Sequence, residues 1–250
     1  MTGMIRWLGE IALFVGRMVV RAVLPPYEVR ETLRQLDDIG TRSLPLVGAA
    51  GAAIGVVLAM QTTSTLARFG AETLLPSMIA ISVVRELGPV ITGLMVAGRI
   101  GAGLAAELGS MRVTEQIDAL EVSAVDPLRY LVAPRVIACT LAMPVLTIYC
   151  DVLALAGGYG AAALGMETSV RLYFDASMEI LGFVDVVPSI AKTLVFGFLI
   201  GTIGCYEGYS VRGGTAGVGR AATIAVVLSS LMVIVSDTVM VRLTQVLFEG

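Results

Sequence analysis

Four charged residues interrupt an otherwise apolar, glycine-rich stretch between residues 76 and 109. They are Arg85, Glu86, Arg99 and Glu107. Facing lipid unpaired, four charges would cost on the order of 10 kcal/mol, so they should face the protein interior, a wet cavity or one another. On a helical wheel Arg85, Arg99 and Glu107 fall within about 80° of one another. Such a row could line a path for a charged group, or its members could form ion pairs that fix the fold.

Two more charges, Lys192 and Asp237, lie in later apolar stretches. A lysine stem can span several ångströms, so we expect the two to pair, with Arg242 as the alternative partner of Asp237. Ser189 stands on the same helix face as Lys192, which would also permit the Ser–Lys dyad of a membrane-embedded hydrolase. The chain has no histidine, which excludes imidazole acid–base or metal chemistry.

Signatures of nucleotide, metal and nucleic-acid binding are missing from the sequence. Lys192 is the only lysine, and Ala191 precedes it where a phosphate-binding loop needs glycine. The cysteines, Cys139, Cys150 and Cys205, lack CxxC spacing and are expected to be small buried residues rather than metal ligands. The net charge of −3 argues against a nucleic-acid partner.

Composition indicates a membrane protein. Of the 250 residues, 56% are hydrophobic and 15% charged, and the mean hydropathy is +0.87. Soluble domains are nearer half apolar and a quarter charged. The apolar runs predict one all-α integral membrane domain over residues 1–250, with transmembrane helices at 44–66, 76–109, 136–164, 188–205 and 221–247. The second would be about 50 Å long, so it must tilt, protrude or bend, most naturally at Gly88-Pro89.

Residues 1–42 are expected to form interfacial and linker helices before the first span. Between residues 4 and 24, one side of the helical wheel gathers Arg6, Glu10, Arg17 and Arg21, and the other side is apolar. This pattern predicts an amphipathic helix lying on the bilayer surface. The alternative is a transmembrane span, in which two arginines at mid-depth would each cost roughly 2.5–3.5 kcal/mol.

Pro25-Pro26 should end that first helix, because proline has no N–H donor and disfavours helix before it. A second short amphipathic helix is predicted at residues 28–39, with Gly40 as its stop. In the span that follows, Gly51 and Gly55 form a GxxxG pair, which marks a face where helix backbones pack closely. That face can pack within the chain or against a second copy.

The sequence turns abruptly polar and acidic after residue 110. Thr114 is a suitable N-cap for a short helix, and Glu115 and Asp118 would stand in its favourable first turn. Ile117, Leu120 and Ala124 repeat at helical spacing, so the loop at residues 110–135 is predicted to contain a short amphipathic helix. The alternative is an ordinary polar connector.

The distribution of arginines predicts the orientation in the membrane. Six lie in residues 1–42, three in 110–135 and two in 206–220, against two in the opposite set of loops, Arg68 and Arg171. These three arginine-rich regions should therefore be cytoplasmic, and five spans then place the C-terminus outside.

Several ordered motifs resemble the MlaE (YrbE) permease family, the membrane subunits of MCE-type ABC lipid transporters. The matching stretches, which lie in register along nearly the whole chain, are Arg85-Glu86-Leu87-Gly88-Pro89-Val90, Ala97-Gly98-Arg99, residues 106–116, residues 124–129, Gly208-Tyr209 and residues 215–221.

The resemblance implies a non-catalytic permease subunit of the bacterial inner membrane that forms a homodimer and handles phospholipid or a related lipid. It implies a cytoplasmic ABC ATPase that binds ATP and Mg²⁺, so that this chain needs no cofactor. It also implies a periplasmic MCE-domain protein and, in some systems, a STAS-domain protein. In the family, the inner loop after the second span is the coupling helix, here residues 112–125.

Roles for individual residues follow from the resemblance and the pattern together, with no catalytic residue among them. Contact with the ATPase is expected of Arg112, Thr114, Glu115, Gln116, Asp118 and Leu120. The lipid pathway or its gating network is expected to include Arg85, Glu86, Arg99 and Glu107. The alternative function is an ion-coupled secondary transporter, against which an odd number of spans and the lack of an inverted repeat argue.

Overall fold

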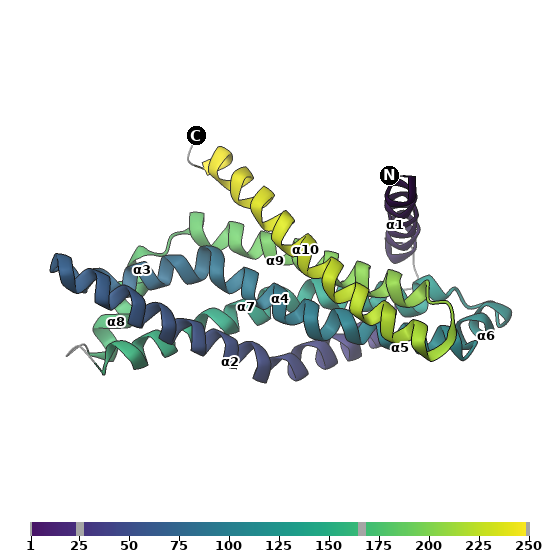
Figure 1. Ribbon diagram of the computed structural model, residues 1–250, viewed down its shortest axis with the longest axis horizontal. Coiled ribbons are helices and arrows are strands. Elements are labelled where there is room, and N and C mark those ends of the chain that lie inside the picture. Colours follow the sequence, from purple (N-terminus) through teal and green to yellow (C-terminus); the bar gives the residue numbers. More distant parts are fainter. Residues whose placement is uncertain (1, 24–27, 165–168, 249–250) are drawn as a thin grey trace. The chain divides into compact units, whose positions relative to one another are not determined.

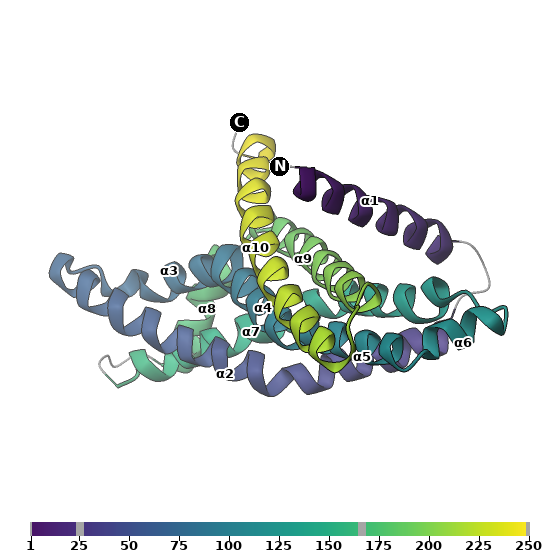
Figure 2. The same cartoon turned by 45° about the vertical axis from the view of Figure 1, so that its right-hand side comes forward.

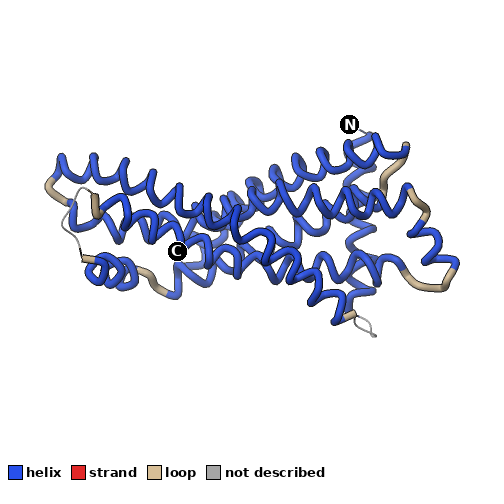
Figure 3. The backbone as a smooth tube through the Cα atoms, turned by 90° about the horizontal axis from the view of Figure 1, so that it is seen from below, coloured by secondary structure: helices blue, strands red, loops and turns tan. Residues whose placement is uncertain are grey.

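The computed structural model describes residues 2–23, 28–164 and 169–248, and the regular elements among these residues are all helical (Figure 3). Figure 1 labels the α-helices α1 (Thr2–Val23), α2 (Val29–Phe69), α3 (Leu75–Ser82), α4 (Gly88–Val96), α5 (Ala102–Val113), α6 (Gln116–Val122), α7 (Ala133–Ala162), α8 (Val170–Ile180), α9 (Phe183–Tyr209) and α10 (Gly214–Phe248). Shorter turns are a 3-10 turn, η1 (Glu72–Leu74), and the π-helical turns η2 (Val83–Leu87), η3 (Ala97–Gly101) and η4 (Leu128–Val132). The predicted all-α fold is confirmed.

Among the described residues, five helical segments are long and apolar enough to cross a membrane. They are Val29–Phe69, Glu72–Val113, Leu128–Ala162, Phe183–Tyr209 and Gly214–Val246. The five predicted spans are therefore found. All five helical segments begin before the predicted spans, which start at residues 44, 76, 136, 188 and 221.

The predicted stop at Gly40 is wrong, because α2 runs without a break through Gly40 and Pro45. A single glycine costs a helix only about 1 kcal/mol relative to alanine, and packing of a buried neighbour such as Ile39 offsets that cost. The expected helix at residues 28–39 is thus the first part of α2. Helix α1 ends at Val23, and Pro25-Pro26 lie outside the described residues.

The chain forms two compact units, each assembled from three separate stretches. Unit 1 comprises Met1–Arg42, Val96–Ala142 and Phe196–Val233, and unit 2 comprises Ser43–Met95, Met143–Val195 and Ile234–Gly250. Residues far apart in the sequence therefore meet within each unit.

The core of unit 1 anchors α1. Phe14 and Met18 of α1 are 9% and 2% exposed, and the Phe14 ring packs edge-on against the ring of Tyr206 on α9, with the centroids 5.4 Å apart. On the polar side of α1, Arg21 contacts Asp126 at 2.5 Å. The apolar side of α1 therefore serves at least partly to bind the protein itself, and its position on the bilayer surface stays a prediction.

In unit 2, α3 and α8 pack side by side (Figures 1 and 2). Tyr173 of α8 is fully buried, and its ring centroid lies 5.5 Å from that of Tyr159 on α7 and 5.7 Å from that of Phe174. The Ser77 hydroxyl of α3 donates a hydrogen bond to the carbonyl oxygen of Ala176, at 3.2 Å. These contacts fix the segment after α7 against the beginning of the second span.

Helices α2 and α7 approach each other backbone to backbone in unit 2. A Cβ added at Gly55 would lie 1.8 Å from the carbonyl oxygen of Ala154, and one added at Gly51 would lie 2.6 Å from the carbonyl oxygen of Cys150. Only glycine fits these positions without a shift of the backbone. Of the two alternatives for the GxxxG pair, the structure therefore has packing within the chain.

We expect Gly55→Ala to lower the free energy of unfolding by about 1–3 kcal/mol, because the new methyl group must push two helix backbones apart. Gly40→Ala on the same helix is the matched control, since a Cβ there would meet nothing within 4 Å. It should be neutral or stabilise by up to about 1 kcal/mol. Thermal unfolding in detergent measures both, and equal stability of the two variants would contradict the close contact.

Candidate functional site

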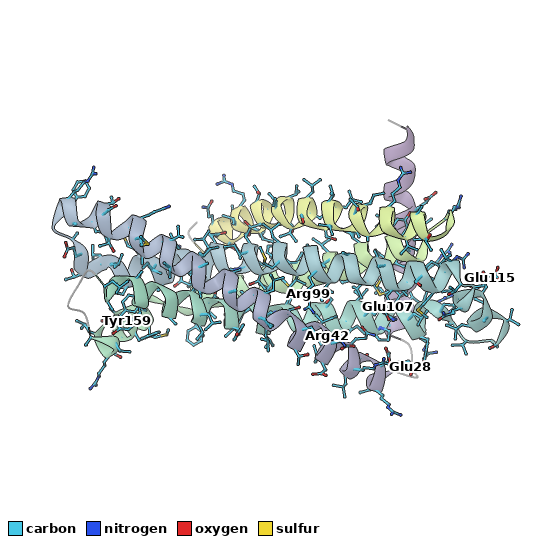
Figure 4. The ribbon with its side chains drawn as sticks, turned by 60° about the horizontal axis from the view of Figure 1, so that its bottom comes forward. Glu28, Arg42, Arg99, Glu107, Glu115 and Tyr159 are labelled. Carbon is cyan, nitrogen blue, oxygen red and sulfur yellow. The ribbon has the colours of Figure 1, made fainter. Side chains whose placement is uncertain are left out.

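The four charges of the second span divide between the two units. Arg85 and Glu86 lie on η2 in unit 2, whereas Arg99 on η3 and Glu107 on α5 lie in unit 1 (Figure 4 labels the latter two). The helical wheel that grouped them assumes an uninterrupted α-helix. The π-helical turns η2 and η3 wind more residues into a turn and so shift the register of everything that follows. The charges therefore belong to two clusters, one in each unit.

Lys192 is the centre of the cluster in unit 2. Its Nζ donates to Glu86 Oε2 at 2.8 Å and to Asp237 Oδ1 at 3.1 Å, and its side chain is only 3% exposed. The structure thus brings Lys192 and Asp237 together and adds Glu86, which the sequence did not connect with them. Arg242, the alternative partner of Asp237, instead contacts Gln245.

A second ion pair extends this cluster. Arg85 Nε donates to Asp185 Oδ1, and Asp185 Oδ2 accepts the Gly182 backbone N–H at 2.8 Å. A cavity of about 80 Å³ lies between the two ion-paired groups and is lined by Arg85, Glu86, Asp185, Ser189 and Lys192 together with residues of α10. Two cations and three carboxylates meet here, so the cluster carries a small excess of negative charge.

The geometry does not favour a Ser–Lys dyad. Ser189 is buried beside Lys192, but no hydrogen bond joins the two in the described part of the chain. Lys192 Nζ instead donates hydrogen bonds to Glu86 and Asp237, whereas the lysine of a dyad must accept the proton of the serine hydroxyl. Nor do the described residues contain a cluster of three or more His, Cys, Asp or Glu placed to hold a metal ion.

The cluster in unit 1 is built around Arg135, at the beginning of α7. Its Nη2 contacts Glu107 Oε1 at 2.7 Å, and its Nη1 donates to the Leu131 carbonyl oxygen at 2.7 Å. The Arg135 side chain is 4% exposed, although the sequence suggests only a loop arginine. The sequence signal for burial of Arg135 is its position directly after Pro134, at the beginning of an apolar run. Beside this pair lies a cleft of about 490 Å³, which Gln116 also lines.

The predicted short helix is present as α6, which begins directly after Glu115 (labelled in Figure 4). Ile117 is fully buried, and Leu120 packs against the same core, so the inner face of α6 is fixed to unit 1. Arg112 Nη1 contacts Asp118 Oδ1 at 2.5 Å, and the Tyr209 hydroxyl donates to Glu121 Oε1 at 3.3 Å. These bonds attach α6 to α5 on one side and to α9 on the other.

The two ends of α6 are unlike the prediction. Thr114 is not an N-cap, because its hydroxyl donates to the Ser110 carbonyl oxygen at 2.9 Å and ends α5. Glu115 instead precedes α6 in the left-handed conformation, with φ 59°, and Ala124 follows it with φ 60°. Such values cost a residue with a side chain roughly 1–2 kcal/mol. The contacts of α6 with its neighbours therefore offset the cost of these two backbone conformations.

The outer face of α6 combines charge with one apolar side chain. Glu115, Gln116 and Asp118 are exposed, and Val122 is 90% exposed. Val122 was missed at the sequence level, since it does not belong to the Ile117 and Leu120 repeat. Leu120 is half-buried and so contributes to the attachment of α6 more than to its outer face.

Neutralising the charged residues of the Lys192 cluster one at a time should lower the free energy of unfolding by unequal amounts. Lys192→Met should be the most destabilising single change, by about 3–5 kcal/mol, because it leaves two carboxylates without their shared cation. Asp237→Asn should cost less, since Glu86 still pairs with Lys192. The double variant should be more stable than the sum of the two single effects predicts.

Thermal unfolding of the purified protein measures these changes, with Arg242→Met, an exposed cation on α10, as the matched control. If Lys192→Met unfolds at the same temperature as Arg242→Met, the cluster does not stabilise the fold.

Comparison with known proteins gives one consistent family. The sequence model described as Permease MlaE matches residues 32–243. A probable ABC transporter permease protein of Rickettsia felis is 42% identical over 236 residues, which cover 94% of this chain and 91% of that protein. The chloroplastic protein TRIGALACTOSYLDIACYLGLYCEROL 1 of Arabidopsis thaliana is 35% identical, with 98% of this chain and 69% of that protein covered. The intermembrane phospholipid transport system permease protein MlaE of Haemophilus influenzae is 34% identical, with 93% and 90% covered. The chain therefore belongs to the MlaE permease family.

Proposed function

We propose that this chain is the membrane subunit of an ATP-driven lipid transporter, which moves phospholipid between the bacterial inner membrane and a periplasmic MCE-domain partner. The observation that carries the proposal is membership of the MlaE permease family, in which the Haemophilus relative is named for intermembrane phospholipid transport. Five long apolar helices and the lack of a phosphate-binding loop in the sequence support it. Energy must then come from a separate cytoplasmic ABC ATPase.

The outer face of α6 is the proposed contact with that ATPase. It presents Glu115, Gln116 and Asp118 around the exposed side chain of Val122, next to the cleft that contains Glu107 and Arg135. A force on α6 would pass to α5 through the Arg112–Asp118 pair and to α9 through Tyr209 and Glu121. This attachment supports a coupling role better than the role of an ordinary polar connector.

The ion-paired charges around Lys192 are proposed to gate the lipid pathway rather than to line it. The cavity beside Lys192 measures about 80 Å³, whereas sites for drug-sized molecules run from about 300 to 1,000 Å³. A phospholipid therefore does not fit there in this state. Glu86, Lys192 and Asp237 would have to change partners for the site to open. In unit 1, Glu107 and Arg135 border a wider cleft of about 490 Å³, so this pair would line the pathway as well.

A second copy of the chain is the proposed partner within the membrane. Helix α10 is the least covered of the five long helices, with 17% of its most apolar stretch buried. Exposed side chains along it include Val227, Leu231, Val235, Val239 and Leu243. Such a surface suits contact with a second copy or with lipid. The arginine distribution supports an orientation in which the N-terminus and α6 are cytoplasmic and the C-terminus is periplasmic. A STAS-domain protein is proposed as a further cytoplasmic partner in some systems.

Purification from native membranes in mild detergent, followed by mass spectrometry of all proteins and lipids, tests this function. We expect an ABC ATPase, an MCE-domain protein and bound phospholipid to accompany the chain. Recovery of the chain without an ATPase, under conditions that keep other complexes intact, would contradict the proposal and favour a transporter driven by an ion gradient.

Reversal of the charge on α6 tests the coupling role. Glu115→Lys should leave folding and dimerisation intact but uncouple ATP hydrolysis from lipid transfer in the reconstituted complex, because it changes the exposed face alone. The matched control is Asp37→Lys, a reversal at an exposed carboxylate of α2. Lipid transferred per ATP hydrolysed is the readout, and normal coupling in Glu115→Lys would refute the assignment.

A further inference from the structure

Asp151 is an acidic residue that the sequence pattern did not single out and that neither charge cluster uses. It lies near the middle of α7, where it is 8% exposed. Its Oδ1 is buried and has no hydrogen-bond partner among the described residues. A carboxylate in such a place is expected to pair with a cation or to bind hydrogen-bond donors, so its isolation needs a physical explanation.

The carboxyl group of Asp151 lies against the beginning of α4. A Cβ added at Gly88 would lie 1.7 Å from Asp151 Oδ1 and 3.1 Å from the carbonyl oxygen of Val83, which accepts the Gly88 N–H. The carboxyl group thus occupies the space that a side chain at residue 88 would fill. Two oxygen atoms that act as acceptors border this same space. An ionised carboxylate cannot donate a hydrogen bond to such an acceptor, whereas a protonated carboxyl group can.

Among the described residues, no cation forms an ion pair with Asp151. On η2, Arg85 pairs with Asp185 and Glu86 pairs with Lys192. The part of α2 that packs against α7, between residues 43 and 67, has no ionisable side chain. On α7 itself, the neighbouring ionisable groups are the phenol of Tyr149 and the buried thiol of Cys150, neither of which is a cation.

A buried hydroxyl lies on the same face of α4. Thr92 stands one helical turn after Gly88 and is fully buried. Among the described residues, its Oγ1 lies beside the Cys150 thiol of α7 and makes no hydrogen bond to an oxygen or nitrogen atom. The contact between α4 and α7 thus buries Thr92 and Cys150 together with Asp151.

We propose that Asp151 is a proton-binding site, at which one proton keeps the carboxyl group neutral while α4 and α7 are packed together. A neutral carboxyl group can donate as well as accept a hydrogen bond, which suits a buried position that borders the same space as a carbonyl oxygen and has no paired cation among the described residues. Loss of the proton leaves a buried charge without a partner, so ionisation favours separation of α4 from α7. By linkage, separation of the two helices favours release of the proton.

Infrared spectroscopy of the purified full-length protein tests the protonation directly. At neutral pH the wild-type protein should show the C=O stretching band of a protonated carboxyl group, and Asp151→Asn should lose it. The matched control is Asp175→Asn on α8, where the aspartate side chain is 70% exposed and the band should stay unchanged. If Asp151→Asn does not fold, Asp151→Leu, which is also uncharged, replaces it. An unchanged band in the variant that folds would overturn the proposal.

The pH dependence of thermal unfolding tests the link between the proton and the helix contact. The proton stabilises the packed state, so the wild-type protein should lose stability as pH rises, and Asp151→Asn should lose less over the same range. Equally steep loss in both proteins would overturn the proposal. Neither experiment measures lipid transfer, so both can test the protonation of Asp151 even if the proposed transport function is wrong.

Discussion

A charge inside an apolar helix needs an opposite charge from another part of the chain, and this requirement organises both units of the structure. Glu86 of the second span and Asp237 of the last meet at Lys192 of the fourth. Glu107 of the second span meets Arg135 of the third. Apolar surfaces alone would let helices slide or rotate in lipid, because lipid tails are as apolar as leucine. Ion pairs, together with the glycine contacts between α2 and α7, fix which helices meet and at what height.

This requirement also explains what the sequence could predict. Five apolar runs predict five spans, and charges within them predict internal pairing, because both follow from composition and the cost of burial. Lys192 and Asp237 could be connected because each is the prominent charge of its own span. Glu86 could not be connected with them, since it lies in the π-helical turn η2, whose altered winding the sequence does not announce. Asp151 escaped notice for a related reason, because its environment depends on how α4 packs against α7.

The errors at Gly40 and Thr114 have a common physical origin. Local preference predicted a helix stop at Gly40 and an N-cap at Thr114, and each preference amounts to about 1 kcal/mol. Burial of the neighbouring side chains exceeds such a preference at α2, and the Thr114 hydroxyl finds a partner in the preceding helix instead. The left-handed conformations of Glu115 and Ala124 follow the same rule, since tertiary contacts of Ile117 and Asp118 impose the position of α6.

Stability alone does not account for buried ion pairs in this chain. Replacement of a buried pair by apolar residues of similar size is often neutral or even stabilising, because desolvation cancels most of the attraction between the charges. What a pair does provide is a steep penalty for any arrangement in which one partner stands alone. Lys192 has two carboxylates within 3.1 Å, so this penalty applies to Glu86 and to Asp237 at once. The cluster therefore fixes the positions of the second, fourth and fifth long helices relative to one another within unit 2, which apolar contacts in lipid would not do.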